Sequence, residues 1–187
     1  MIKDIIKQSR SYRRFDGNVK ITRDTLQSLV DLARFSPSMR NQQALKFLLS
    51  CDKKTNNLIF PTLAWAGALK DWPGPGDGER PSAYIVVVGD TKISRDFGPD
   101  YGIVAQSILL GATEMGLGGC MIGSIKKDAL KKSLLLDERF QILLVTALGK
   151  PNERIVLEDI KEGNVRYYRD KDSCHHVPKR TLKELII

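Results

Sequence analysis

Apolar positions along the chain follow two different periods, which predict a mixture of helices and strands. In residues 22–35, Leu26, Leu29 and Ala33 recur at the spacing of one helix face, after a threonine that can cap the helix. By contrast, residues 83–89 are apolar on both faces, which is typical of a central strand. The same reasoning predicts further helices at 2–9, 58–69, 101–115 and 126–135, and further strands at 45–50, 120–122 and 141–148.

The predicted elements do not alternate in a strict strand–helix–strand order, so an α+β layered fold is favoured over a doubly wound sheet. The 187 residues suffice for one domain spanning 1–187. Residues 101–115 are apolar nearly all round, which indicates a helix buried within the fold or at a subunit interface. Residues 72–81 are rich in proline and glycine and predict an irregular loop, either a surface connector or a cover over a site.

The charge of the chain bears on what it binds. The net charge is +8, but the lysines and arginines are dispersed and no aromatic-interleaved basic stripe is present. An anionic small molecule is therefore a better expectation than nucleic acid. No apolar run approaches bilayer length and the N-terminal residues do not resemble a signal peptide, so we expect no membrane association and a cytoplasmic location.

The cysteines and histidines do not predict a metal centre or a covalent catalyst. Cys51, Cys120 and Cys174 are too widely spaced for a metal or redox motif, and a disulfide framework is not expected. Cys174 is followed by His175 and His176, but successive side chains of an extended segment point in opposite directions. The sequence therefore predicts no metal ligands.

Basic and hydroxyl side chains gather near both ends of the chain. Arg10, Ser11 and Arg13 offer guanidinium forks and a neutral donor, the groups that grip a phosphate. Lys179 and Arg180 form a second basic group, and the two groups could converge on one phosphate. The alternative for each is an ordinary solvated surface.

Carboxamides lie between these basic groups. Asn41 and Gln43 can donate and accept hydrogen bonds, as recognition of a heterocycle requires, whereas Ser38 is equally explained by turn chemistry after Pro37. The glycine-rich residues 116–124 close a helix and open a strand, so they fail as a dinucleotide fingerprint. They predict either a tight connection or backbone exposed to a ligand. A phosphate grip with a carboxamide pair indicates a phosphorylated heteroaromatic cofactor.

Five segments follow one another along the chain: Arg10-Ser11-Tyr12-Arg13-Arg14-Phe15, Ser36-Pro37-Ser38 with Asn41 and Gln43, Gly116 to Gly123, Gly149-Lys150-Pro151, and Val177-Pro178-Lys179-Arg180. In this order they make the chain resemble the FMN-dependent nitroreductase family over almost its whole length. The chain departs from the family pattern at Ser9, where a basic residue is frequent, and at Ala44–Leu45, where a Pro–Trp pair is frequent.

The resemblance implies a three-layer sandwich, with a mainly antiparallel central sheet flanked by helices, in an intertwined homodimer. It implies FMN at two interface sites, with hydride passing from NADH or NADPH through flavin N5 to a nitroaromatic, quinone or similar acceptor in a ping-pong mechanism. The protein would then supply no catalytic side chain of its own. By this similarity the phosphate end is bound by Arg10, Ser11, Arg13, Lys179 and Arg180, and the ring by Pro37, Ser38, Asn41, Gln43, Ile122, Gly123 and Ser124.

Two alternatives remain at this point. The same fold could serve another redox role, such as dehalogenation or flavin breakdown. The same arginine and amide groups could also belong to a non-catalytic module that binds a phosphorylated nucleotide.

Overall fold

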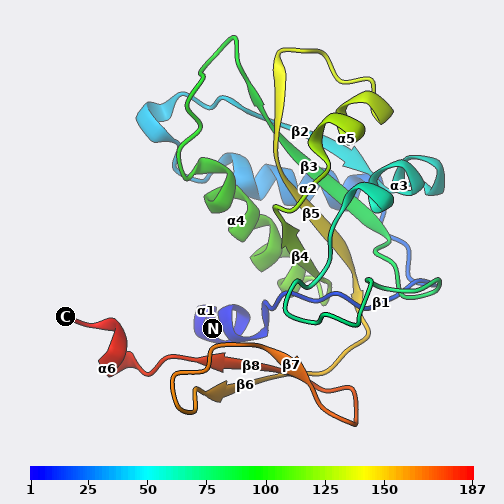
Figure 1. Ribbon diagram of the computed structural model, residues 1–187. Helices are drawn as coiled ribbons and strands as arrows, with labels where there is room; N and C mark the ends of the chain where they lie inside the picture. The colour runs from blue at the N-terminus through cyan, green and yellow to red at the C-terminus, as the bar shows by residue number, and fades with distance from the viewer.

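The computed structural model describes residues 1–187, and its main sheet is antiparallel throughout (Figure 1). The strand order is β1–β5–β3–β2, and β4 also pairs with the long strand β5. The strands of this sheet are β1 (Phe15–Asp16), β2 (Leu45–Ser50), β3 (Ala83–Asp90), β4 (Gly118–Ile122) and β5 (Phe140–Pro151).

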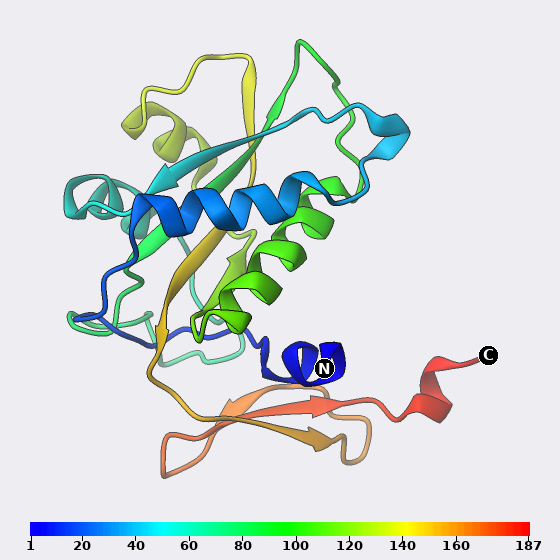
Figure 2. The same cartoon turned by 180° about the vertical axis from the view of Figure 1, so that it is seen from behind.

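Helices cover both faces of the sheet, which makes three layers. Figure 2 shows α2 and α4 crossing one face, and Figure 1 shows α3 and α5 on the other. Each face has its own apolar cluster, because alternate residues of β3 point to opposite sides. The α+β sandwich expected from the sequence is therefore confirmed. The helices are α1 (Ile2–Gln8), α2 (Arg23–Arg34), α3 (Lys53–Ile59), α4 (Asp100–Glu114), α5 (Lys127–Ser133) and α6 (Leu182–Leu185).

The strongest sequence patterns produced the elements they predict. The Thr22 hydroxyl accepts a hydrogen bond from the Thr25 N–H at 3.1 Å and begins α2, whose Leu26 and Leu29 are fully buried. Every residue of β3 is buried, as a central strand between two helical layers requires.

The helix predicted at residues 58–69 is wrong. The helix α3 begins earlier, at Lys53, because the Asp52 carboxylate accepts a hydrogen bond from the Thr55 N–H at 2.8 Å. It ends at Ile59, and a single 3₁₀ turn follows at Phe60–Thr62 with Pro61 near its start. Ala66 has a φ of 41°, which no right-handed helix contains.

The apolar helix α4 is buried mostly by its own chain. It packs on α2 and on the sheet through residues such as Ala105, Ile108 and Ala112, none of which is exposed. Ile103 remains 36 % exposed. The sequence left open whether this helix is buried within the fold or at a subunit interface, and packing within the fold accounts for most of its burial.

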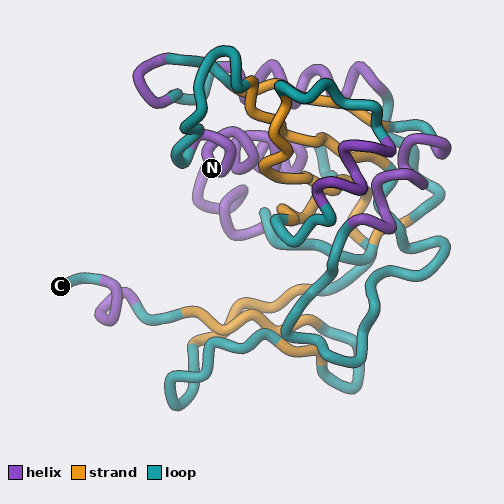
Figure 3. The backbone as a smooth tube through the Cα atoms, turned by 45° about the horizontal axis from the view of Figure 1, so that its top comes forward, coloured by secondary structure: helices purple, strands orange, loops and turns teal.

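A second, three-stranded sheet follows the main sheet and was not predicted as a sheet. Its central strand β8 (His175–Lys179) pairs in parallel with β6 (Ile155–Asp159) and antiparallel with β7 (Tyr168–Arg169). Figures 1 and 3 show this small sheet beside the end of the main body that carries α1, with α6 extending beyond it. None of the helices has the length and apolar character that crossing a membrane requires.

Candidate functional site

The segment after α1 is held against the main sheet by backbone hydrogen bonds. Ser11 forms a bridge with Gly119 of β4, and the Tyr12 N–H donates to the Gly119 carbonyl at 3.0 Å. A Cβ at the preceding Gly118 would lie 2.6 Å from Tyr12 Cδ2, so only glycine leaves room for the Tyr12 ring on β4. The sequence therefore fixes Arg10, Ser11 and Arg13 at the edge of the sheet.

These three residues line a cavity of about 350 Å³ together with Lys179 of the small sheet. The Arg10 guanidinium donates to the Ile6 carbonyl at 2.7 Å, while its buried Nε has no hydrogen-bond partner. Burial lowers the pKa of Arg10, although a guanidinium stays charged at any ordinary pH. Arg10 and Arg13 from one end of the chain and Lys179 from the other thus line the same cavity.

Two neighbouring basic residues do not belong to this cavity. Arg180 pairs with Glu184 at 3.4 Å on the exposed C-terminal helix, so the expectation that it joins Lys179 at the phosphate has no support in the geometry of this chain. Arg14 instead pairs with Glu79 at 2.6 Å. That pair anchors the loop at residues 72–81, which is irregular as predicted.

Sequence reasoning missed Glu153, which holds the Arg13 segment in place. Its carboxylate accepts from the backbone N–H groups of Arg13 and Arg14, and it pairs with Arg169 of β7 at 2.9 Å. The Glu153 side chain is only 1 % exposed. An isolated glutamate after Gly149-Lys150-Pro151 has no distinguishing pattern, and only the tertiary structure brings it under the N-terminal segment.

His175 and Tyr167 also line the cavity and were not predicted. The Arg13 guanidinium lies 4.9 Å from the centre of the Tyr167 ring, and its Nη1 is 3.5 Å from His175 Nε2. Burial, followed by the nearby Arg13 charge, lowers the pKa of His175 to about 4. His175 is therefore neutral at physiological pH, and the positive charge in this cavity comes from arginine and lysine.

The backbone at Ile122, Gly123 and Ser124 lines a second cavity of about 180 Å³. Arg13, Met121 and Tyr167 line both cavities, so the two are adjacent. Trp65 forms another wall, and its buried Nε1–H has no hydrogen-bond partner. The structure thus brings the predicted 122–124 segment beside the predicted phosphate cavity.

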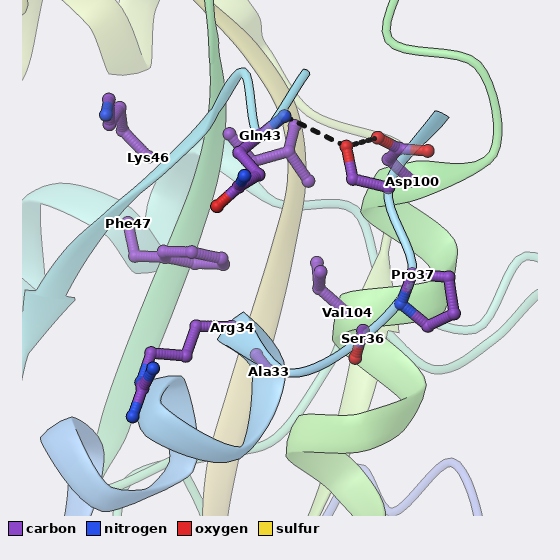
Figure 4. A pocket seen from close by; sticks show the side chains of 11 residues that line it. Ala33, Arg34, Ser36, Pro37, Gln43, Lys46, Phe47, Asp100 and Val104 are labelled. Carbon is purple, nitrogen blue, oxygen red and sulfur yellow. Dashed lines mark hydrogen bonds between the residues drawn. The ribbon is translucent and has the colours of Figure 1, made fainter. Parts of the chain in front are cut away.

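The remaining predicted residues lie elsewhere in this chain. Pro37, Ser38 and Gln43 line a third cavity of about 210 Å³, between the end of α2, β2 and the start of α4 (Figure 4). This cavity shares no lining residue with the other two. Asn41 is not in its wall, but the Gln43 amide nitrogen donates to Asn41 Oδ1 at 3.2 Å.

The loop that carries these amides is fixed by one buried carboxylate. Asp100 accepts from the Ser38 hydroxyl at 2.8 Å and from the Met39 N–H at 2.9 Å, and Ser38 Oγ in turn accepts from the Gln43 N–H at 3.0 Å. Ser38 therefore has the turn-stabilising role that the sequence left open for it. Arg40, Asn41 and Gln43 have φ of 53°, 54° and 51°, a left-handed conformation that is uncommon for arginine and glutamine and better tolerated by asparagine.

Comparison with known proteins gives a consistent result over most of the chain. The model of the nitroreductase family matches residues 6–76 and 77–150. The Bacillus subtilis (strain 168) protein YodC, provisionally named an NAD(P)H nitroreductase, is 23 % identical, with 79 % of this chain and 88 % of YodC covered.

Solved structures give the same fold. A provisionally assigned nitroreductase from Exiguobacterium sibiricum 255-15, solved in complex with FMN, has a TM-score of 0.70 and 20 % identity, with 82 % of this chain and 89 % of that chain covered. A gut-bacterial enone reductase, CLA-ER, has a TM-score of 0.71 and 20 % identity, with 87 % and 93 % covered.

Proposed function

This chain belongs to the nitroreductase family, and from that premise we propose that it is a flavin-dependent oxidoreductase. It would bind FMN, accept reducing equivalents from NADH or NADPH, and reduce a nitroaromatic, a quinone or a similar small molecule. The observation that carries this proposal is the convergence of Arg10, Ser11, Arg13 and Lys179 on one cavity. Relatives named as NAD(P)H nitroreductases or solved with FMN support it.

The residues present fit a flavin phosphate. Two guanidinium groups, an ammonium group and a hydroxyl supply charge-assisted and neutral donors, and Arg10 Nε lacks a partner within the chain. Arg13 stands where the phosphate cavity meets the cavity at residues 122–124. A ligand that extends from one cavity into the other would place its phosphate beside Arg10 and its aromatic part beside Trp65.

When bound, FMN supplies the two-electron redox chemistry of a ping-pong reaction. The chain's own residues then need only to bind and orient. Arg13 supplies positive charge at the junction of the two cavities, which would favour an anionic ring system there. Glu153 and Tyr167 hold the Arg13 segment. No acid–base pair is required of the protein in this scheme.

The proposed site is completed by a second copy of the chain. Asp100 fixes the loop at residues 37–43 by bonding to Ser38 and to the Met39 N–H. The cavity lined by Pro37, Ser38 and Gln43 is separate from the other two in a single chain. We infer that in a homodimer these three residues and Asn41 line the flavin ring of the partner's site. Ile103, partly exposed on α4, is available for the contact between the copies.

The test is the absorbance spectrum of the purified protein, followed by anaerobic addition of NADH and NADPH separately. Flavin absorption that bleaches with either donor, and returns on addition of a quinone or a nitroaromatic, is the expected result. A protein that is colourless and does not take up added FMN would contradict the proposal. If flavin absorption is present but neither NADH nor NADPH bleaches it, FMN binding is supported and the proposed electron donor is wrong.

A further inference from the structure

The turn between β7 and β8 brings three side chains of different chemistry together. Asp170, Cys174 and His176 each offer one ligand atom, and these atoms all lie within 4.8 Å of one another. The carboxylate and the imidazole are already in contact, with Asp170 Oδ2 3.0 Å from His176 Nε2. Within the proposed oxidoreductase function this cluster has no role, because it does not line any of the three cavities described above.

The extended backbone explains both this cluster and the failure to predict it. Successive side chains of β8 alternate, so His175 points toward Arg13 and the cavity while His176 points the other way. Cys174 and His176, two residues apart, can therefore lie on one face. The tight turn at residues 170–174 then brings the Asp170 carboxylate beside Cys174 and His176.

The carboxylate is oriented before any ion arrives. Asp170 Oδ1 accepts hydrogen bonds from the N–H groups of Asp172 at 3.0 Å and Cys174 at 2.8 Å. These bonds fix the carboxylate and leave Oδ2 facing the imidazole. Cys174 is 8 % exposed, so its thiol is held in the packed turn rather than free in solvent.

The imidazole is oriented in the same way from the opposite side. Glu158 Oε2 of β6 lies 3.0 Å from His176 Nδ1, and the Tyr168 ring stacks on the His176 ring at 4.7 Å between centres. The Tyr168 hydroxyl donates to Glu158 Oε1 at 3.2 Å. A carboxylate on one ring nitrogen, with the other nitrogen facing further ligands, is the usual surrounding of a metal-bound histidine.

We propose that Asp170, Cys174 and His176 bind a zinc ion, with Glu158 as the outer carboxylate and a fourth position open to water. A thiolate, an imidazole and a carboxylate together suit Zn²⁺ better than Mg²⁺ or Ca²⁺, which prefer oxygen ligands alone. Tetrahedral ligands at about 2.0–2.3 Å from zinc lie roughly 3.3–3.8 Å apart, so small side-chain rotations suffice. Binding releases the Cys174 thiol proton and any proton shared between His176 and Asp170.

The bound ion would link the turn between β7 and β8, through Asp170 and Cys174, to β8, through His176. Cys174 and His176 flank His175, which faces the cavity that contains Arg13 and Lys179. Zinc would therefore stabilise the strand from the side opposite that cavity.

The experiment is a titration of the full chain, with any affinity tag removed, first with Co²⁺ and then with Zn²⁺. Difference spectra are recorded against Cys174→Ser, so that flavin absorption cancels. We expect a cobalt–thiolate charge-transfer band, lost on adding one equivalent of Zn²⁺ per chain. In competition with a chromophoric chelator, Glu158→Gln should weaken zinc binding about 10- to 100-fold.

Two control variants keep the interpretation specific. Cys51→Ser removes a half-buried thiol outside the cluster, and Asp172→Asn removes a neighbouring carboxylate whose side chain is not a ligand; both should leave zinc affinity unchanged. His176→Gln tests the site without altering the thiol, and circular dichroism checks that each variant is folded. No cobalt–thiolate band in the folded protein, or equal zinc affinity in Cys174→Ser, would overturn the proposal.

Discussion

At the scale of single residues, the candidate site depends on side chains that hold others in place. Arg10, Ser11 and Arg13 were expected at a phosphate because guanidinium and hydroxyl groups suit one and because the chain resembles the nitroreductase family. Glu153 was not expected in the site, because a single acid gives no signal until folding brings it beneath the Arg13 segment. His175 was considered only together with its neighbours, and its position inside the cavity follows from the alternation of β8.

We expect Arg13→Ala or Lys179→Ala to weaken FMN binding about 10- to 100-fold each, because a charged hydrogen bond contributes about 1.5–3 kcal/mol. Flavin fluorescence quenching measures the dissociation constant. Arg180→Ala is the matched control, since its side chain pairs with Glu184 outside the cavity. If Lys179→Ala and Arg180→Ala raised the FMN dissociation constant equally, the cavity would not be the FMN phosphate site.

A second substitution tests the buried carboxylate. Glu153→Gln keeps the shape of the side chain but leaves the Arg169 guanidinium, 14 % exposed, without its charged partner. We expect a loss of about 3 kcal/mol in the free energy of unfolding, measured by urea denaturation. The comparison is the pair Lys131–Glu138, whose glutamate side chain is 95 % exposed, and Glu138→Gln should cost less than about 1 kcal/mol. Similar losses would mean that the Glu153 pair is no stronger than a surface pair.

At the scale of elements, prediction succeeded where periodicity and capping agreed and failed where a turn decided the outcome. The helix α2 and the strand β3 were clear because their apolar patterns are long. The helix α3 was misplaced because the Asp52 cap and Pro61 outweigh the apolar residues that follow. The small sheet was missed because its strands are short and half-exposed, and because β6 pairs with β8 across some twenty residues of sequence.

The contact between the N-terminal segment and β4 can be tested through Gly118. A methyl group at Gly118 would meet the Tyr12 ring at 2.6 Å and Pro151 at 2.7 Å, so Tyr12 would have to move away from β4. We expect Gly118→Ala to lower the free energy of unfolding by about 1–3 kcal/mol in thermal or urea denaturation. Gly102→Ala, in open space on α4, should be neutral or slightly stabilising. A neutral Gly118→Ala would mean that Tyr12 packs less closely on β4.

At the scale of the whole molecule, the sequence could indicate an α+β sandwich but could not say how the two halves of the site meet. The carboxamide loop and the phosphate cavity were expected at one ligand, and in one chain they form separate cavities. In the proposed homodimer a second copy brings the two together, and no pattern in a single sequence encodes the geometry of such a contact.

Mixing variants tests whether the site is shared between copies. Arg13→Ala and the double variant Asn41→Ala/Gln43→Ala should each be weakly active alone. When co-expressed, they should form mixed dimers with one intact site, restoring roughly a quarter of the wild-type sites. Arg13→Ala mixed with Lys179→Ala should restore none, because both changes affect the same cavity. No recovery in the first mixture would place both halves of the site in one copy.

Lys179 lies on the small sheet, whereas Arg10 and Arg13 lie on the segment that is paired to β4. A small sheet with few buried residues is the kind of unit that opens independently of the main core. An anion held by both sides of the cavity would stabilise only the closed arrangement, and the opening would become rarer in proportion to ligand concentration. The amide hydrogens of β8 should therefore exchange with solvent more slowly once the cavity is filled, so that the cofactor acts as part of the fold.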